Sequence, residues 1–427
     1  MEKTLKILFN IFRVLLGLVL IFSGFSKGVD PLGTAYKFNE YFASVGLPEM
    51  DNMSLIFSFL MNSAEFLIGV ALVTGIFFNL TAWTALLFYG FFTVLTFLLA
   101  VFNPVTDCGC FGDALKISNW ATFYKNVVFI VLISFVFIRR KKFIFYSHLW
   151  VEWATLIITI LVIFSISVYS YRHLPIVDFI PYSTGSNISE KMKIPAGAPI
   201  DEYETILTYK NLKSGKTEDF TMNNYPWQDS LNWKWAGTKS VLKKKGYTPP
   251  IHDFSISTPE GNNITEPILS DTSYTFLFIA YNINKADPTG LSEAERIKAY
   301  CEMTNNCKFY AVTASASNDF MKIKNLYGIS YNFNSGDETA LKTAIRSNPG
   351  LILLKNGTVL GKWHYNDMKE IAFRNGNFFS ECITKLRKSG EWTLSIAIIF
   401  GLWFVLSLIW AVSLRIKNKE QGTRSNE

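Results

Sequence analysis

The sequence predicts a helical membrane protein with six transmembrane helices and a large extracytoplasmic α/β domain. Three observations lead to this fold class. Hydrophobic residues make up 49% of the 427 residues, they gather in long uninterrupted blocks, and basic residues cluster beside those blocks. A chain of this length also exceeds what a single core usually supports, so we expect a membrane region and a separate folding unit outside it.

Six apolar blocks are long enough to cross about 30 Å of hydrocarbon. They comprise residues 7–25, 53–77, 80–102, 120–138, 149–169 and 392–414. The first block lacks a cleavage site of small residues, so we interpret it as an uncleaved helix and not as a signal peptide.

Basic residues predict the orientation of these helices. They precede the first helix (Lys3, Lys6), follow the fourth (residues 139–142) and follow the sixth (residues 415–419). If all three clusters are cytoplasmic, residues 103–119 and 172–390 lie outside, in the periplasm of a cell with an inner membrane. Residues 30–52 also lie outside, as either an amphipathic helix on the membrane surface or an ordered loop.

These boundaries divide the chain into six segments. Residues 1–146 form a four-helix transmembrane domain, 147–171 a fifth helix, and 172–246 an extracytoplasmic tether with a β-rich segment. Residues 247–375 form an α/β domain, 391–415 the sixth helix, and 416–427 a cytoplasmic tail.

The extracytoplasmic region alternates between strand and helix patterns. Residues 204–209 and 217–222 predict a β-hairpin. Strands are then expected at 275–281, 309–313, 351–354 and 358–363, with helices at 292–303 and 318–327. Ser292 is the expected N-cap of the first of these helices. Strands that alternate with helices and end in a hairpin indicate a mixed α/β fold.

The membrane region, about residues 5–140, resembles the DoxX/MauE family of four-helix membrane proteins. The resemblance rests on Arg13 with Phe-Ser-Gly-Phe-Ser-Lys at 22–27, on Glu65 with Gly69, and most specifically on Asp-Cys-Gly-Cys-Phe-Gly-Asp at 107–113. It implies a role in maturation of a disulfide-rich periplasmic protein, or in thiol redox linked to quinone. The whole layout resembles a DoxX-type protein of Bacteroidetes.

Residues 247–368 resemble a thioredoxin-like domain of the peroxiredoxin/TlpA type. The similarity is carried by Asp-Phe-Ser-Ile at 253–256, by Pro-Glu-Gly at 259–261, and by Pro349 in the place of the family's cis-proline. Residues 282–288, where the family has its catalytic cysteine, contain none. A thioredoxin-type dithiol mechanism therefore does not carry over, and the resemblance implies a degenerate binding module.

Cys108 and Cys110 are the strongest catalytic candidates. Two thiols one residue apart can close only a small strained ring, which makes a disulfide easier to reduce. Gly109 between them can adopt the positive φ that such a ring needs. A redox-active pair is the preferred interpretation, ahead of a structural or reduced pair. We predict no metal here, because two thiolates without a nearby histidine make a poor zinc site.

Cys301 and Cys307 lie at the end of a predicted helix and the start of the next strand. A structural disulfide that closes the turn is the simplest interpretation. Exchange with the membrane pair is the alternative. The fifth cysteine, Cys382, is interpreted as a bystander.

Four charged residues fall inside the apolar blocks, where charge is costly, and one of them, Glu152, is interpreted as interfacial. Arg13 and Glu65 could pair across a helix interface, either as a structural ion pair or as a proton or quinone site. Lys125 lies within a turn or two of the outer surface and could extend its amine there.

Two functions of different classes fit these features. The first is a membrane thiol-disulfide redox component, with an extracytoplasmic client or redox partner. The second is a non-enzymatic scaffold or assembly factor, so whether the chain is an enzyme stays open. A transporter is less favoured, because no pair of broken helices marks a midplane site. A quinone is the single cofactor considered. The formal charge of +7 clusters beside the apolar blocks, which argues against nucleic acid as a partner.

Overall fold

A computed structural model describes residues 2–105, 107–143, 148–244, 246–304, 306–371, 373 and 379–380. The chain divides into two compact units. One contains Met1–Ser186 and Phe254–Glu427, and the other is Asn187–Asp253. The first unit holds both the membrane helices and the α/β domain.

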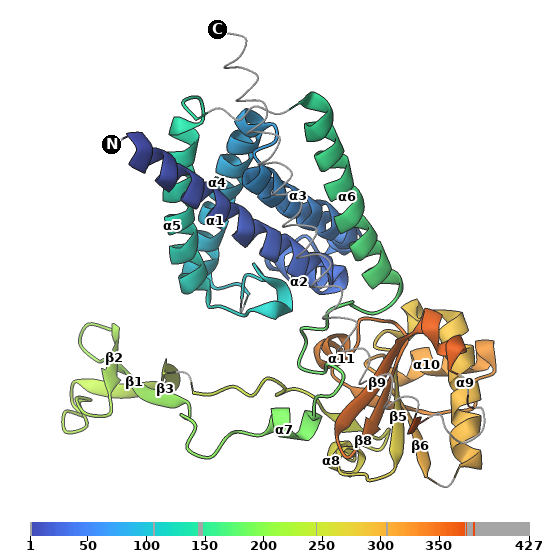
Figure 1. Ribbon diagram of the computed structural model, residues 1–427. Coiled ribbons are helices and arrows are strands. Elements are labelled where there is room, and N and C mark those ends of the chain that lie inside the picture. Colours follow the sequence, from blue (N-terminus) through green and yellow to red (C-terminus); the bar gives the residue numbers. More distant parts are fainter. Residues whose placement is uncertain are drawn as a thin grey trace. The chain divides into compact units, whose positions relative to one another are not determined.

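Five helices in the described part of the chain are long and apolar enough to cross a membrane (Figure 1). They are α1 (Glu2–Gly28), α3 (Ser54–Thr74), α4 (Phe78–Phe102), α5 (Asn119–Arg139) and α6 (Leu149–Arg172). The chain is therefore a multi-pass membrane protein. The sixth predicted helix, residues 392–414, and Cys382 lie outside the described residues.

Close helix packing in the membrane region depends on glycine. Helix α1 packs mainly against α3. A Cβ atom added to Gly24 would lie 2.5 Å from the backbone nitrogen of Phe66, and one added to Gly69 would lie 2.7 Å from the nitrogen of Ile21. No larger residue fits at these two positions without moving a backbone, which is how small residues bring membrane helices together.

The segment after α1, for which the sequence left a helix and a loop open, contains helix α2 (Pro31–Ser44) and a short 3₁₀ turn, η1 (Pro48–Met53). The Asp30 side chain caps α2 by accepting a 2.8 Å hydrogen bond from the Gly33 backbone N–H. Pro31 at the first helical position needs no such partner. Helix α2 packs on α3, where the Ser58 hydroxyl donates to the Pro31 carbonyl.

The α/β domain is built on a six-stranded sheet with the order β4-β7-β6-β5-β8-β9. Its strands are β4 (Ile256–Ser257), β5 (Tyr274–Ile279), β6 (Cys307–Thr313), β7 (Phe333–Gly336), β8 (Gly350–Lys355) and β9 (Thr358–His364). Strands β5, β6 and β7 are parallel, whereas β4, β8 and β9 run antiparallel to their neighbours.

Among the described residues, four helices accompany this sheet, and Figure 1 labels them beside it. They are α8 (Thr265–Leu269), α9 (Pro288–Met303), α10 (Ser317–Tyr327) and α11 (Glu338–Ala344). The Asn348–Pro349 peptide bond before β8 is cis. The strand order and the cis-proline confirm the expected thioredoxin-like fold.

Helix α9 begins earlier than the sequence predicts. The expected N-cap, Ser292, is wrong, because the helix starts at Pro288 and the Asp287 side chain accepts from the Thr289 N–H at 2.9 Å. Proline at the first helical position and an aspartate before it make a strong helix start, so Ser292 falls inside the helix.

The second unit contains a short helix, α7 (Ile188–Met192), and a three-stranded antiparallel sheet with the order β2-β1-β3. Its strands are β1 (Glu202–Asn211), β2 (Thr217–Thr221) and β3 (Trp233–Lys244). The first two form the predicted hairpin. The sequence analysis assigned no strand at β3.

This second unit is an insertion whose two ends are fixed to the first unit's own residues. Before it, Gly185 donates to the Val359 carbonyl at 2.8 Å, and Val359 donates to the Ser186 carbonyl at 2.9 Å. After it, the ring of Phe254 packs on that of Tyr182, with centroids 5.6 Å apart.

Candidate functional site

The predicted catalytic pair lies on a short turn between α4 and α5, which we call the cysteine loop (residues 107–113). Cys108 and Cys110 are free cysteines whose Sγ atoms lie 2.7 Å apart. Gly109 between them has φ +62°, the left-handed conformation that glycine adopts without strain. The turn thus places the two sulfur atoms next to each other.

The backbone of the cysteine loop is held by side chains from distant parts of the chain. Tyr41 of α2 donates its hydroxyl to the Cys108 carbonyl at 2.7 Å, and Ser23 of α1 donates to the Cys110 carbonyl. Within the loop, the Asp107 carboxylate accepts from the Gly109 N–H at 3.0 Å. These bonds satisfy the loop's backbone groups and fix the position of both cysteines.

Positive charge surrounds the loop. Lys37 of α2 pairs with Asp107 at 3.3 Å and with Glu40 at 2.9 Å. The amine of Lys125, which the sequence placed near the outer surface, lies 4.3 Å from the centre of the Phe111 ring. The charge of Lys125 lowers the pKa of both Cys108 and Cys110, because a nearby cation favours the thiolate.

The two thiols are not equivalent. The hydrogen bond with Cys110 lowers the pKa of Cys108, burial opposes this, and Thr122, the Cys110 N–H and Lys125 add to the lowering, to about 6. The same hydrogen bond, together with burial, raises the pKa of Cys110 well above its ordinary value. The contact between the two sulfur atoms therefore favours ionisation of Cys108 over that of Cys110.

The hydroxyl of Thr122 on α5 can form a hydrogen bond with Cys108 or with the backbone of its own helix. Its hydroxyl oxygen lies 3.5 Å from Cys108 Sγ and also 3.0 Å from the Ser118 carbonyl. A hydroxyl has one proton, so Thr122 can donate either to the carbonyl or to the thiolate. The thiolate is the better acceptor because it is charged.

The predicted intramembrane pair is wrong in one partner. Glu65 forms a buried ion pair with Lys27 at the end of α1, and not with Arg13. The Arg13 guanidinium donates instead to the carbonyls of Leu72 and Val73, the latter at 2.9 Å. Helices α1 and α3 are antiparallel. The C-terminal end of α1, with Lys27, therefore lies beside Glu65, whereas Arg13 lies beside the C-terminal end of α3.

The structure also brings a residue of the α/β domain to the cysteine loop. Arg346, between α11 and the cis-proline, donates to the Asp113 carboxylate at 2.6 Å. Arg346 and Thr122 were not among the residues expected at the site, whereas Ser23, in the motif at 22–27, and Tyr41, in the segment 30–52, were noted without this role. Arg346 carried one visible signal, which was its position three residues before Pro349.

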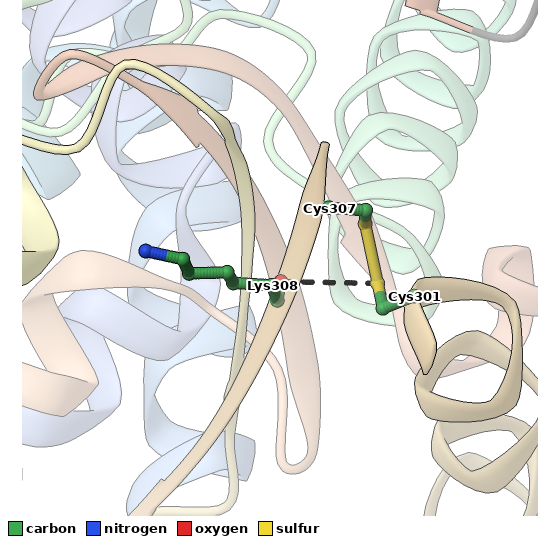
Figure 2. The surroundings of a disulfide bond; sticks show 3 residues. All are labelled: Cys301, Cys307 and Lys308. Atoms are coloured by element: carbon green, nitrogen blue, oxygen red, sulfur yellow. Dashed lines mark hydrogen bonds between the residues drawn. A yellow bond between two sulfur atoms is a disulfide. The ribbon is translucent and has the colours of Figure 1, made fainter. Parts of the chain in front are cut away.

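Cys301 and Cys307 are joined in a disulfide between the end of α9 and the start of β6, with Cα atoms 4.8 Å apart (Figure 2). Cys307 pairs with Tyr274 at the first residue of β5. The residues that contact the membrane region follow the last residue of β5. The disulfide lies at one end of β5 and the residues that contact the membrane region lie at the other, about 17 Å away along the strand. The disulfide therefore lies away from the cysteine loop.

Family comparisons match two parts of the chain. Residues 5–139 match the model of the family described as methylamine utilisation protein MauE. Residues 203–245, which contain most of β1 and all of β2 and β3, match a domain of unknown function (DUF8463). No curated protein gives a significant match.

Solved structures resemble the α/β domain. A thiol-disulfide oxidoreductase from Bacteroides fragilis has 16% identity and a TM-score of 0.24, over 32% of this chain and 98% of that one. A thiol:disulfide interchange protein of the thioredoxin family from Chlorobium tepidum has 12% identity and a TM-score of 0.20, over 31% and 92%. The strand order and the cis-proline define the fold of this domain independently of these similarities.

Proposed function

We propose that this chain, in which a MauE-type membrane region is joined to a thioredoxin-like domain, exchanges electrons with a disulfide-bonded extracytoplasmic protein through Cys108 and Cys110. The observation that carries the proposal is the asymmetry of the pair. The two Sγ atoms lie 2.7 Å apart, and the pKa is lowered for Cys108 but raised for Cys110. A nucleophilic thiolate beside a second thiol is what disulfide exchange requires.

The exchange needs two steps. The Cys108 thiolate attacks one sulfur of the partner's disulfide, so that a mixed disulfide forms and the partner's other sulfur leaves as a thiolate, which takes a proton from solvent. Cys110 then loses its proton and attacks Cys108 Sγ. This releases the partner's second thiolate and leaves a Cys108–Cys110 disulfide. The partner gains two electrons and the chain loses two; run in reverse, the same steps oxidise a partner dithiol.

The proposed setting is the periplasmic face of an inner membrane. The basic residues beside α1 and α5 favour a cytoplasmic location for those helix ends, which puts the cysteine loop on the opposite side. A membrane quinone is the proposed second substrate, since the loop joins two membrane-spanning helices. Dithiol and quinone would give disulfide and quinol, with two electrons and two protons transferred.

A scaffold is the second candidate, and one feature of the α/β domain favours it. Residues 282–288, where a thioredoxin-type cysteine would be expected, contain none, and the backbone carbonyl of Asn282 accepts a 2.8 Å hydrogen bond from the Asn348 side chain. The α/β domain therefore has no thiol chemistry of its own at this edge. A chain acting as a scaffold would not need Cys108 or Cys110.

Thiol trapping in intact cells separates the two functions. We would alkylate cells with a membrane-impermeant reagent, with and without prior reduction, and compare wild type with Cys108→Ser and Cys110→Ser. The redox proposal predicts a mixed disulfide with a partner protein in Cys110→Ser, because the resolving thiol is absent, and none in Cys108→Ser. The paired variant Cys301→Ser/Cys307→Ser is the control and should behave as wild type. A permanently reduced pair, with no mixed disulfide in any variant, would leave the scaffold as the function.

A further inference from the structure

One edge of the α/β domain contacts the membrane region of its own chain. This is the edge that follows β5 and precedes β8, where thioredoxin-type proteins would place their cysteine and cis-proline. The hydroxyl of Tyr281, two residues after β5, lies 3.0 Å from that of Tyr36 on α2. The Lys342 amine of α11 lies 5.2 Å from the centre of the Tyr36 ring. The edge is therefore covered by α2 and is not free for a client protein.

Arg346 is the charged centre of this contact. Its side chain is 4% exposed. Its Nε atom donates to Asp30 Oδ2 at 2.8 Å and its Nη2 atom to Asp113 Oδ2 at 2.6 Å. Nη1 donates to the Lys342 carbonyl. Every nitrogen of the guanidinium has an acceptor, which is the condition under which a buried arginine is tolerated.

The two carboxylates come from separate elements. Asp30 caps α2, and Asp113 ends the cysteine loop three residues after Cys110. Burial raises the pKa of Asp113, but Arg346 and then Lys116 outweigh burial and hold that pKa below its ordinary value. Lys116 is the second cation on this carboxylate, at 3.3 Å. Arg346 thus joins the α/β domain, α2 and the cysteine loop at one point.

Only Phe111 and Gly112 separate Asp113 from Cys110. The backbone turns sharply at Gly112, with φ +56°, and its N–H donates to the Gly109 carbonyl at 3.0 Å. A connection this short transmits a displacement of Asp113 to the turn that holds the two sulfur atoms together.

We propose that Arg346 is a positioning residue for the thiol exchange: by holding Asp113 against Asp30 it keeps the cysteine loop in the turn that brings Cys108 and Cys110 together. The thioredoxin-like domain then acts on its own chain's membrane region, as a support for the dithiol. This inference rests on the proposed function, since it concerns how the same pair is held.

Gly33 offers a way to disturb this contact without changing a charge. A Cβ atom at Gly33 would overlap Asp30 Oδ2 and lie 3.1 Å from Arg346 Nη2. Gly33→Ala should therefore push the carboxylate and the guanidinium apart while both remain present. Arg296 of α9 provides the matched control. It donates to the Met368 and Ile371 carbonyls, at 2.9 and 2.8 Å, and among the described residues its hydrogen bonds stay within the α/β domain.

The test measures the dithiol itself in purified full-length protein. Wild type, Arg346→Met, Arg346→Lys, Gly33→Ala and Arg296→Met are equilibrated with glutathione buffers, and the fraction of Cys108–Cys110 disulfide is read by alkylation. Arg346→Met and Gly33→Ala should lower the equilibrium constant for closing the Cys108–Cys110 disulfide by about tenfold, because the loop no longer holds the two sulfur atoms together. Arg346→Lys, which keeps the charge but cannot bind two carboxylates in the same way, should fall between them and wild type. Arg296→Met should match wild type.

An unchanged equilibrium constant in Arg346→Met and Gly33→Ala would overturn the inference and leave the redox proposal standing. If wild type itself forms no Cys108–Cys110 disulfide in any buffer, the proposed function fails first. Should Arg346→Met fail to fold, Gly33→Ala and Asp113→Asn decide the question, with the intact Cys301–Cys307 disulfide as the measure of a folded domain.

Discussion

Replacing Cys110 by alanine should make Cys108 a slower nucleophile. The hydrogen bond between the two sulfur atoms, at 2.7 Å, is the largest influence on the Cys108 pKa of about 6. With this pKa about nine-tenths of Cys108 is thiolate at pH 7, against about one hundredth for an ordinary cysteine. Alanine removes the hydrogen-bond donor while burial of Cys108 remains. We therefore expect its pKa to rise by at least about one unit, which lowers the thiolate fraction about tenfold below the midpoint.

Serine at position 110 is the matched control. Cys110→Ser keeps a donor of similar size, so its pKa for Cys108 should lie between those of wild type and Cys110→Ala. Neither variant can form the Cys108–Cys110 disulfide, so each reports Cys108 alone. The assay is the rate of alkylation from pH 5 to 9, with Cys382→Ser in every protein to silence the fifth cysteine. Since the thiolate reacts, the rate should rise with pH and level off above the midpoint.

Coincident profiles for the alanine and serine variants would show that the sulfur–sulfur contact does not set the reactivity of Cys108. A wild-type midpoint near the ordinary cysteine value would refute the reasoning more broadly. It would mean that burial outweighs the hydrogen bonds and the Lys125 charge together.

Three further predictions concern stability. Gly24→Ala places a methyl group against the α3 backbone and should lower the denaturation temperature of the membrane region, whereas Gly90→Ala on α4, whose added carbon would lie an ordinary 3.8 Å from Ile130, should not. Lys27→Met should destabilise the protein by about 3 kcal/mol, because it leaves the buried Glu65 carboxylate without its positive partner. The further change Glu65→Leu should recover part of that loss in the same thermal assay. Breaking the Cys301–Cys307 disulfide should cost the α/β domain about 2 kcal/mol in a denaturant titration without changing alkylation of the cysteine loop.

The membrane helices are the part of the fold that the sequence predicts best. The block expected at 120–138 is α5 (Asn119–Arg139), and the one expected at 80–102 is α4 (Phe78–Phe102). Bilayer thickness sets the length of such helices, and hydropathy marks both ends. In the α/β domain, β5 was visible because it is a continuous run of buried residues. Strand β7 (Phe333–Gly336) was not, since four residues with two polar side chains carry no pattern.

Only part of the candidate site can be predicted from the sequence. The two cysteines and Gly109 stand out in the sequence, but nothing in it shows which residues hold them. Ser23, Tyr41 and Arg346 bind the cysteine loop across sequence separations of 87, 67 and 233 residues. No local pattern encodes such contacts.

The exchange of Arg13 for Lys27 as the partner of Glu65 has a physical origin. Arg13 and Lys27 lie 14 residues apart on one helix, about 21 Å along its axis. Glu65 can reach one of them and not the other. Which one it reaches depends on the register between α1 and α3, and that register is set by the connection through α2 and η1. The sequence shows that two charges must meet within the membrane but leaves their alignment undetermined.

The insertion between α6 and the thioredoxin-like domain leaves and re-enters at neighbouring points, since Ser186 is tied to β9 and Phe254 packs on Tyr182. When the two ends of an inserted segment lie close together, the entropic cost of closing the segment grows only slowly with its length. Such a module can be lengthened, replaced or excised without rethreading the rest of the protein. Evolution could therefore exchange residues 187–253 as a cassette, and a short glycine bridge in their place should leave the surrounding domain intact.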